Sequence, residues 1–227
     1  MEEGYAVLRD AGSRWPGDAG LDFQGAQLFR YAGFLDEAQR RFERSHSVDP
    51  LFSAEGWIPR TPYYRGDYAR FLEVLPAIES PIFRFYRASA ELARGRDAEA
   101  KRLLEPVFRM SSSDLFARLS QALLAILEGH EKEGGVILDH LALQRAELGG
   151  SDGEVTYKIA QLYARAGAGD RALGQLALAV DQGFFCASCV RAEPLFAALR
   201  GRADYRRLLL AAEERHGNFG ERFALRE

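Results

Sequence analysis

Residues 160–180 read AQLYARAGAGDRALGQLALAV, in which a glycine has a small residue seven positions before it and another five positions after it. The same arrangement occurs in AQLFRYAGFLDEAQRRFERSHSVDP at 26–50, ASAELARGRDAEAKRLLEPVF at 88–108 and ALLAILEGHEKEGGVILDHLA at 122–142. With Gly66 included, the glycines are 33, 29, 34 and 38 residues apart. They are Gly33, Gly66, Gly95, Gly129 and Gly167. Self-similarity at a nearly constant period indicates a repeat protein.

This pattern predicts pairs of antiparallel helices joined by tight turns. Glycine adopts the left-handed backbone conformation that such a turn requires, and small residues on each side let the two helices approach closely. Signals for helix ends fall where the period requires them: Asp49-Pro50, Ser80-Pro81, SDLF at 113–116 and SDGE at 151–154. The last of these reads as a capping box from Ser151 to Glu154.

The repeat resembles the tetratricopeptide repeat, whose unit of 34 residues has small, glycine, alanine and proline landmarks at these offsets. The resemblance covers nearly the whole chain and implies an all-α, right-handed α-solenoid of about five helix-turn-helix units. We expect one domain, with a partial-repeat helix at 1–17, about five repeats at 18–182 and capping helices at 183–227. The N-terminal helix would be the second helix of a preceding unit, which favours a fragment of a larger protein over a natural capping helix.

The C-terminal part resembles the closing segment of tetratricopeptide regions in bacterial Ser/Thr protein kinases and winged-helix regulators. The resemblance rests on Gly183-Phe184-Phe185, Glu193-Pro194, Leu199-Arg200-Gly201 and Tyr205. The sequence has no glycine-rich nucleotide loop, no HRD and no DFG, so we expect no enzyme here. The expected function is a non-catalytic scaffold that binds a protein or peptide. The alternative is a regulatory or oligomerisation module of a larger bacterial signalling protein.

Composition narrows the class of partner. The chain is 47% hydrophobic and 28% charged, which is typical of a soluble globular protein. Its net charge of −3 comes from interspersed acidic and basic residues, so no strong field attracts nucleic acid. No signal peptide and no apolar run of about 18 residues is present, which predicts a cytoplasmic chain without a membrane span. Self-association is possible.

Cys186 and Cys189 are the only cysteines and form a C-x-x-C motif. A structural zinc site needs four ligands, and the chain has neither a second C-x-x-C nor an H-x3–5-H pair. A thioredoxin-like redox pair needs a βαβ context, whereas the period here is helical. We therefore expect two semi-buried cysteines that serve packing, and no catalytic residue, metal or cofactor.

In this repeat architecture the first helices of successive units line a concave groove. The segment GWIPRTPYYRGDY at 56–68 is the least regular unit, because Pro59 and Pro62 fall where a first helix should run. Its aromatic and arginine residues are typical of binding hot spots, although the alternative, that they pack between neighbouring repeats, is slightly favoured. The predicted partner-binding residues are Gln27, Arg30, Tyr31, Trp57, Arg60, Tyr63, Tyr64, Arg65, Phe85, Tyr86, Ser89, Tyr157, Lys158, Gln161 and Arg165.

Overall fold

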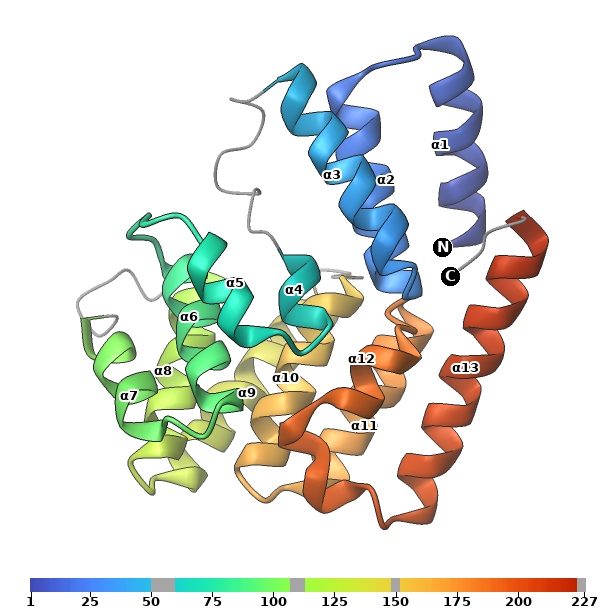
Figure 1. The fold of residues 1–227 in the computed structure, drawn as a ribbon. Coiled ribbons are helices and arrows are strands. Elements are labelled where there is room, and N and C mark those ends of the chain that lie inside the picture. The colour runs from blue at the N-terminus through green and yellow to red at the C-terminus, as the bar shows by residue number, and fades with distance from the viewer. Residues whose placement is uncertain (50–59, 107–112, 148–151, 224–227) are drawn as a thin grey trace.

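Adjacent pairs of helices make up the fold in this computed structural model, which describes residues 1–49, 60–106, 113–147 and 152–223 (Figure 1). The pairs are α2 (Ala19–Ala32) with α3 (Leu35–Val48), α4 (Arg60–Tyr64) with α5 (Tyr68–Val74), α6 (Pro81–Ala93) with α7 (Asp97–Leu104), α8 (Leu115–Leu127) with α9 (Glu131–Glu147), and α10 (Gly153–Arg165) with α11 (Gly169–Asp181). Before them lies α1 (Glu2–Arg14), and after them α12 (Ala187–Ala192), the 3-10 helix η2 (Pro194–Leu199) and α13 (Ala203–Phe223). Over these ranges no strand occurs, so the all-α prediction is confirmed.

The turns within the pairs follow the predicted pattern. All five repeat glycines have positive φ, between 74° and 93°. The predicted alanines beside them have no exposed surface: Ala26, Ala38, Ala88, Ala100, Ala122, Ala160 and Ala172. In the fourth unit Gly134 replaces the alanine, because a Cβ there would lie 2.9 Å from the Ala122 carbonyl oxygen. Small residues therefore set how closely each pair packs.

The predicted helix starts are confirmed at α8 and α10, with one correction. Asp114 Oδ1 accepts a hydrogen bond from the Ala117 amide at 2.8 Å, and Asp152 Oδ1 accepts one from the Glu154 amide at 3.0 Å. The predicted role of Glu154 in a capping box is wrong. Its carboxylate points into the protein interior, where it accepts a hydrogen bond from Tyr64, instead of back to the start of the helix. Ser151 lies outside the described residues.

The start of α1 lies beside the end of α13, so the first and last helices are in contact and the array closes on itself (Figure 1). A buried apolar cluster joins α1–α3 to α11–α13 through Tyr5, Phe29, Ala32, Phe34, Ala38, Val180, Phe185, Ala187, Ala212 and Phe219. The Tyr31 carbonyl accepts a hydrogen bond from the Phe185 amide at 2.9 Å, and His216 Nδ1 lies 2.7 Å from the Ala32 carbonyl. Contacts between first and last units are not part of a solenoid in which each unit touches only its neighbours.

Candidate functional site

Several of the predicted groove residues meet in the interior around one carboxylate, Glu154. Its Oε2 lies 3.0 Å from Arg30 Nη2 and 3.3 Å from Arg60 Nη1. Its Oε1 accepts hydrogen bonds from the hydroxyls of Tyr64 and Tyr86, each at 2.6 Å. These five residues, from α2, α4, α6 and α10, are called the central cluster below. All five are buried.

The charges of the central cluster stabilise the ionised form of Glu154. Burial alone would raise the pKa of this carboxyl, but the positive charges of Arg30 and Arg60 and the hydrogen bonds from Tyr64 and Tyr86 outweigh it. The pKa of Glu154 is therefore held well below its usual range. Burial raises the pKa of Tyr64 well above its ordinary value, so its hydroxyl keeps the proton that it donates.

Lys158 lies one helical turn after the central carboxylate and is enclosed by aromatic rings. Its Nζ lies 4.1 Å from the ring centre of Tyr63, 4.9 Å from that of Tyr64, 5.0 Å from that of Tyr86 and 5.5 Å from that of Tyr157. Among the described residues Nζ has no hydrogen-bond partner. Burial lowers the pKa of Lys158 to about 7, so the ammonium sheds its proton far more easily than an exposed lysine does.

A second buried carboxylate, Glu193, ties η2 to α10. Glu193 Oε2 accepts a hydrogen bond from Gln161 Nε2 and lies 3.4 Å from the Tyr157 hydroxyl. Its Oε1 accepts the Leu195 amide at 3.1 Å, which caps η2 at the predicted Glu193-Pro194 start. Burial raises the pKa of Glu193. The apolar core thus contains two buried polar clusters, one around Glu154 and one around Glu193.

Most of the predicted binding residues are consequently inaccessible. Buried side chains are those of Arg30, Arg60, Tyr63, Tyr64, Phe85, Tyr86, Ser89, Tyr157, Lys158 and Gln161. Gln27, Tyr31 and Arg165 are half-buried, Arg65 is exposed, and Trp57 lies outside the described residues. The expectation that these residues line an open groove is wrong for the buried ones, because contact between the first and last units encloses them and Glu154 pairs with their charges. The alternative of aromatic packing between repeats fits Tyr63, whose ring contacts those of Phe71 and Tyr86.

The C-x-x-C motif is more deeply buried than expected. Cys186 and Cys189 expose 0% and 3% of their surface and are joined by a disulfide. Cys186 is also the N-cap of α12, and its sulfur lies 3.3 Å from the Cys189 amide. The expectation of two semi-buried cysteines is wrong, because both are fully buried and paired with each other. Within the described ranges no cluster of three or more His, Cys, Asp or Glu residues could hold a metal ion.

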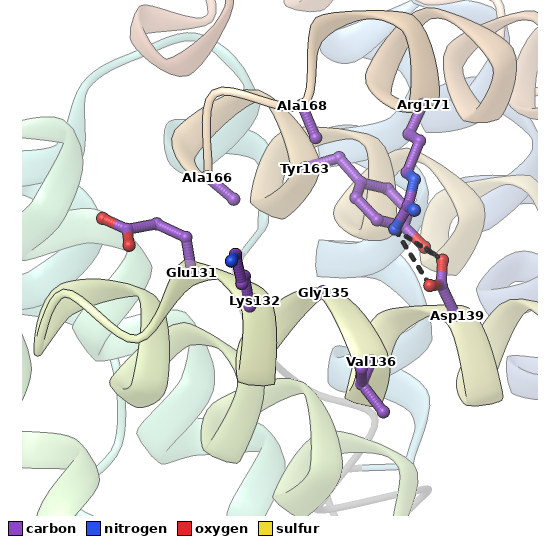
Figure 2. Close-up of a pocket in the computed structure, with 9 residues that line it drawn as sticks. All are labelled: Glu131, Lys132, Gly135, Val136, Asp139, Tyr163, Ala166, Ala168 and Arg171. Atoms are coloured by element: carbon purple, nitrogen blue, oxygen red, sulfur yellow. Dashed lines mark hydrogen bonds and ion pairs between the residues drawn. The ribbon is translucent and has the colours of Figure 1, made fainter.

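An open pocket of about 390 Å³ lies on the surface between α9, the end of α10 and the start of α11 (Figure 2). It is lined by Glu131, Lys132, Gly135, Val136, Asp139, Tyr163, Ala166, Ala168 and Arg171. Figure 2 shows Arg171 and the Tyr163 hydroxyl converging on Asp139 at one end. The distances from Asp139 are 2.9 Å to Arg171 Nη1 and 2.6 Å to the Tyr163 hydroxyl. These contacts fix that end of the pocket, while Val136 and the two alanines supply apolar lining and Glu131 and Lys132 lie at the start of α9.

Exposed aliphatic side chains occur on the two helices beside this pocket. Val136 is 53% exposed and Leu143 59% exposed on α9, and Leu178 is 42% exposed on α11. Leu143 follows Val136 by seven residues and Leu178 follows Arg171 by seven, so each leucine lies on the helix face that borders the pocket. The pocket with these two leucines is called the outer groove below. Sequence reasoning did not find it, because the groove was expected on the first helices.

A second pocket, of about 380 Å³, lies among α1, α2 and α3 beside the exposed Trp15. Arg41 and Arg44 line it, but both pair with the buried Asp22. Its polar side chains are therefore largely engaged within the chain.

Comparison with family models, curated proteins and solved structures finds no match for this chain. Among the described helices, none has the length and apolar character needed to cross a membrane. Function is therefore inferred from the residues of the chain itself.

Proposed function

We propose that this chain is a non-catalytic scaffold that binds a protein or peptide, and that it does so through the outer groove. The observation that carries the proposal is an apolar-lined surface pocket beside exposed Val136, Leu143 and Leu178. Exposed apolar surface that gathers in one place, unlike single scattered residues, is typical of interaction sites. Of the charged groups at the pocket, Asp139 and Arg171 are paired with each other, and Glu131 and Lys132 lie at its border, as polar groups do at the rim of a binding surface.

The proposal includes a tetratricopeptide-like array as the scaffold. Five glycine turns with positive φ and seven fully buried alanines support it. A buried polar network that links α2, α4, α6 and α10 would keep the helix pairs in fixed positions, and a preformed surface loses less entropy on binding. A regulatory or oligomerisation module of a larger bacterial signalling protein stays the alternative prediction, with self-association through the same groove.

Affinity capture with matched variants tests this function. The intact chain, a groove variant with Val136→Glu and Leu143→Glu, and a control with Leu210→Glu on α13 would be immobilised and exposed to a lysate of the source organism. Leu210 is 63% exposed, so its substitution adds a charge without touching the groove. Equal helicity of the three would be checked by circular dichroism.

A protein retained by the intact chain and the control, but lost by the groove variant, supports the proposal. Equal retention by all three would place the binding surface elsewhere on the scaffold. Retention of no protein, with a monomeric mass by light scattering, would contradict the scaffold function.

A further inference from the structure

We infer that the occupant of the outer groove is a basic amphipathic helix, which places one large apolar side chain in the pocket and lysine or arginine side chains over its borders. This inference rests on the proposed function and names its partner class. Three features of the groove carry it: its charge, its volume and the spacing of its apolar residues.

The exposed charges around the groove are mostly acidic. The turn before α9, α9 and α11 together carry six exposed acidic residues and two exposed basic ones, a net charge of −4. The pocket itself is lined by two of each sign, and the acidic excess lies outside its lining. The acidic residues are Glu128, Glu131, Glu133, Asp139, Asp170 and Asp181, and the basic ones are Lys132 and Arg171. The whole chain carries only −3, so this surface is more acidic than the rest of the protein together.

Ion pairing within the chain does not remove this excess. Asp139 is neutralised by Arg171, and Asp170 by Arg202, whose Nη2 lies 2.7 Å from Asp170 Oδ1. Four acidic residues then remain against Lys132 alone. Charges within about 8 Å, the screening length at physiological salt, act on a bound ligand. A partner with several positive charges is therefore favoured over a neutral or acidic one.

The pocket volume is large enough for one apolar side chain of a partner. About 390 Å³ lies at the small end of the range for ligand pockets. Its walls offer Val136, Ala166 and Ala168, which suit a leucine, methionine or phenylalanine. An anchor of this kind beside a charged rim is the usual arrangement when an amphipathic helix lies in a groove.

The spacing of the apolar residues also suits a helix. Val136 and Leu143 are seven residues apart on α9, which corresponds to about 10 Å along the helix axis. A partner helix lying along α9 presents its own residues i, i+3 or i+4, and i+7 over that length. On α11, Gly174 lies between Arg171 and Leu178, and an added Cβ there would meet no atom within 4 Å. This face of α11 is therefore open to the close approach of another helix.

A peptide selection tests the inference. A display library of random 16-residue peptides would be selected against the intact chain, and the enriched sequences would be synthesised with a fluorescein label for anisotropy titration. Two variants address the groove: Gly174→Trp, which adds bulk between Arg171 and Leu178 on α11, and Glu131→Lys with Glu133→Lys, which reverses the charge at the start of α9. Both sites are exposed, so the fold should tolerate the changes.

Matched controls come from α13. Gly217→Trp adds the same bulk at a helical glycine whose Cβ would also meet nothing within 4 Å, and Glu214→Lys with Glu221→Lys makes the same change of charge. We expect enriched peptides with net positive charge and apolar residues at helical spacing. Their affinity should fall at least tenfold in both groove variants and change less than twofold in both controls.

Two results would overturn the inference. Enriched peptides that are acidic, or that bind the groove variants as tightly as the intact chain, would refute the basic helix while leaving a peptide-binding function in place. If no peptide were enriched in repeated selections, the inference would fail, and the affinity capture described above would decide the proposed function separately.

Discussion

Replacing Glu154 by glutamine should destabilise the protein strongly. The substitution keeps the shape of the side chain but removes the one negative charge between Arg30 and Arg60, which lie 3.0 Å and 3.3 Å from it. Removing one partner of a buried ion pair typically costs about 3–5 kcal/mol, because the remaining charge is left without compensation. Here two guanidinium groups lose their partner, so the free energy of unfolding should fall by at least about 3 kcal/mol.

The hydroxyl groups point to the same magnitude. Tyr64 and Tyr86 each donate to the carboxylate at 2.6 Å, and a hydrogen bond to a charged group contributes about 1.5–3 kcal/mol. The amide oxygen of glutamine can still accept hydrogen bonds from the two hydroxyls, but as a neutral acceptor it recovers only part of this stabilisation. Typical domains have a free energy of unfolding of about 5–15 kcal/mol, so the Glu154→Gln protein should retain little net stability.

Urea titration followed by circular dichroism at 222 nm measures the effect. Glu73→Gln is the control, since Glu73 pairs with Arg70 on the surface, and its change should stay within about 0.5 kcal/mol. Because the pKa of Glu154 is lowered in the folded chain, its contribution is present above the unfolded value of about 4.3 and is lost as pH falls below it. The difference between wild type and Glu154→Gln should therefore shrink below pH 4. A difference under about 1 kcal/mol at pH 7 would refute the reasoning.

Three further tests address other parts of the structure. The free energy of unfolding should rise from pH 7 to about 9.5. Over this range Lys158 is deprotonated in the folded chain but still protonated in the unfolded chain, where its pKa is about 10.4. Urea titrations of the Lys158→Met variant should therefore show a flatter rise with pH. Gly33→Ala should be more destabilising than Gly66→Ala by roughly 1 kcal/mol in the same assay. Both glycines have positive φ, but only at Gly33 would the Cβ meet other atoms, an imidazole nitrogen at 3.1 Å and a backbone Cα at 3.2 Å. Cys186→Ser with Cys189→Ser should lower stability by about 2 kcal/mol, from the entropy of a short closed loop, and unchanged stability would contradict a formed disulfide.

Local features of this fold could be predicted from the sequence because they depend on neighbouring residues. A positive φ at Gly95 or Gly129 follows from the turn geometry of one helix pair, and the burial of Ala160 follows from the close approach of the pair's two helices. The start of α6 at Pro81 depends on two adjacent residues. Each of these needs no knowledge of how distant units are placed.

The interior could not be predicted in the same way. Glu154 is a common helix-start residue by local pattern, and its real partner Arg30 lies 124 positions earlier in the chain. The repeat resemblance predicted that Tyr64 and Lys158 line a concave surface. In the structure the two side chains do lie together, but they are buried in the interior. What the repeat pattern lacks is the contact between first and last units, which turns that surface inward.

The outer groove was missed for a related reason. Val136 and Leu143 are two apolar residues in a helix with no clear apolar face, and the binding groove was expected on the first helices of the units. Only the position of α9 beside α11 and the end of α10 leaves them at the edge of a pocket. The signal available in the sequence was the acidic run from Glu128 to Glu133.

The contact between the first and last units also affects how the protein should unfold. In a linear array, each terminal unit has a neighbour on one side only, so unfolding can start at an end and proceed unit by unit. Here Tyr5 contacts Phe219 and Phe223, and Glu2 pairs with Arg222, so neither end is a weak starting point. Melting of any helix pair breaks contacts on both sides of it. The chain should therefore resist fraying and lose its helices in one cooperative step.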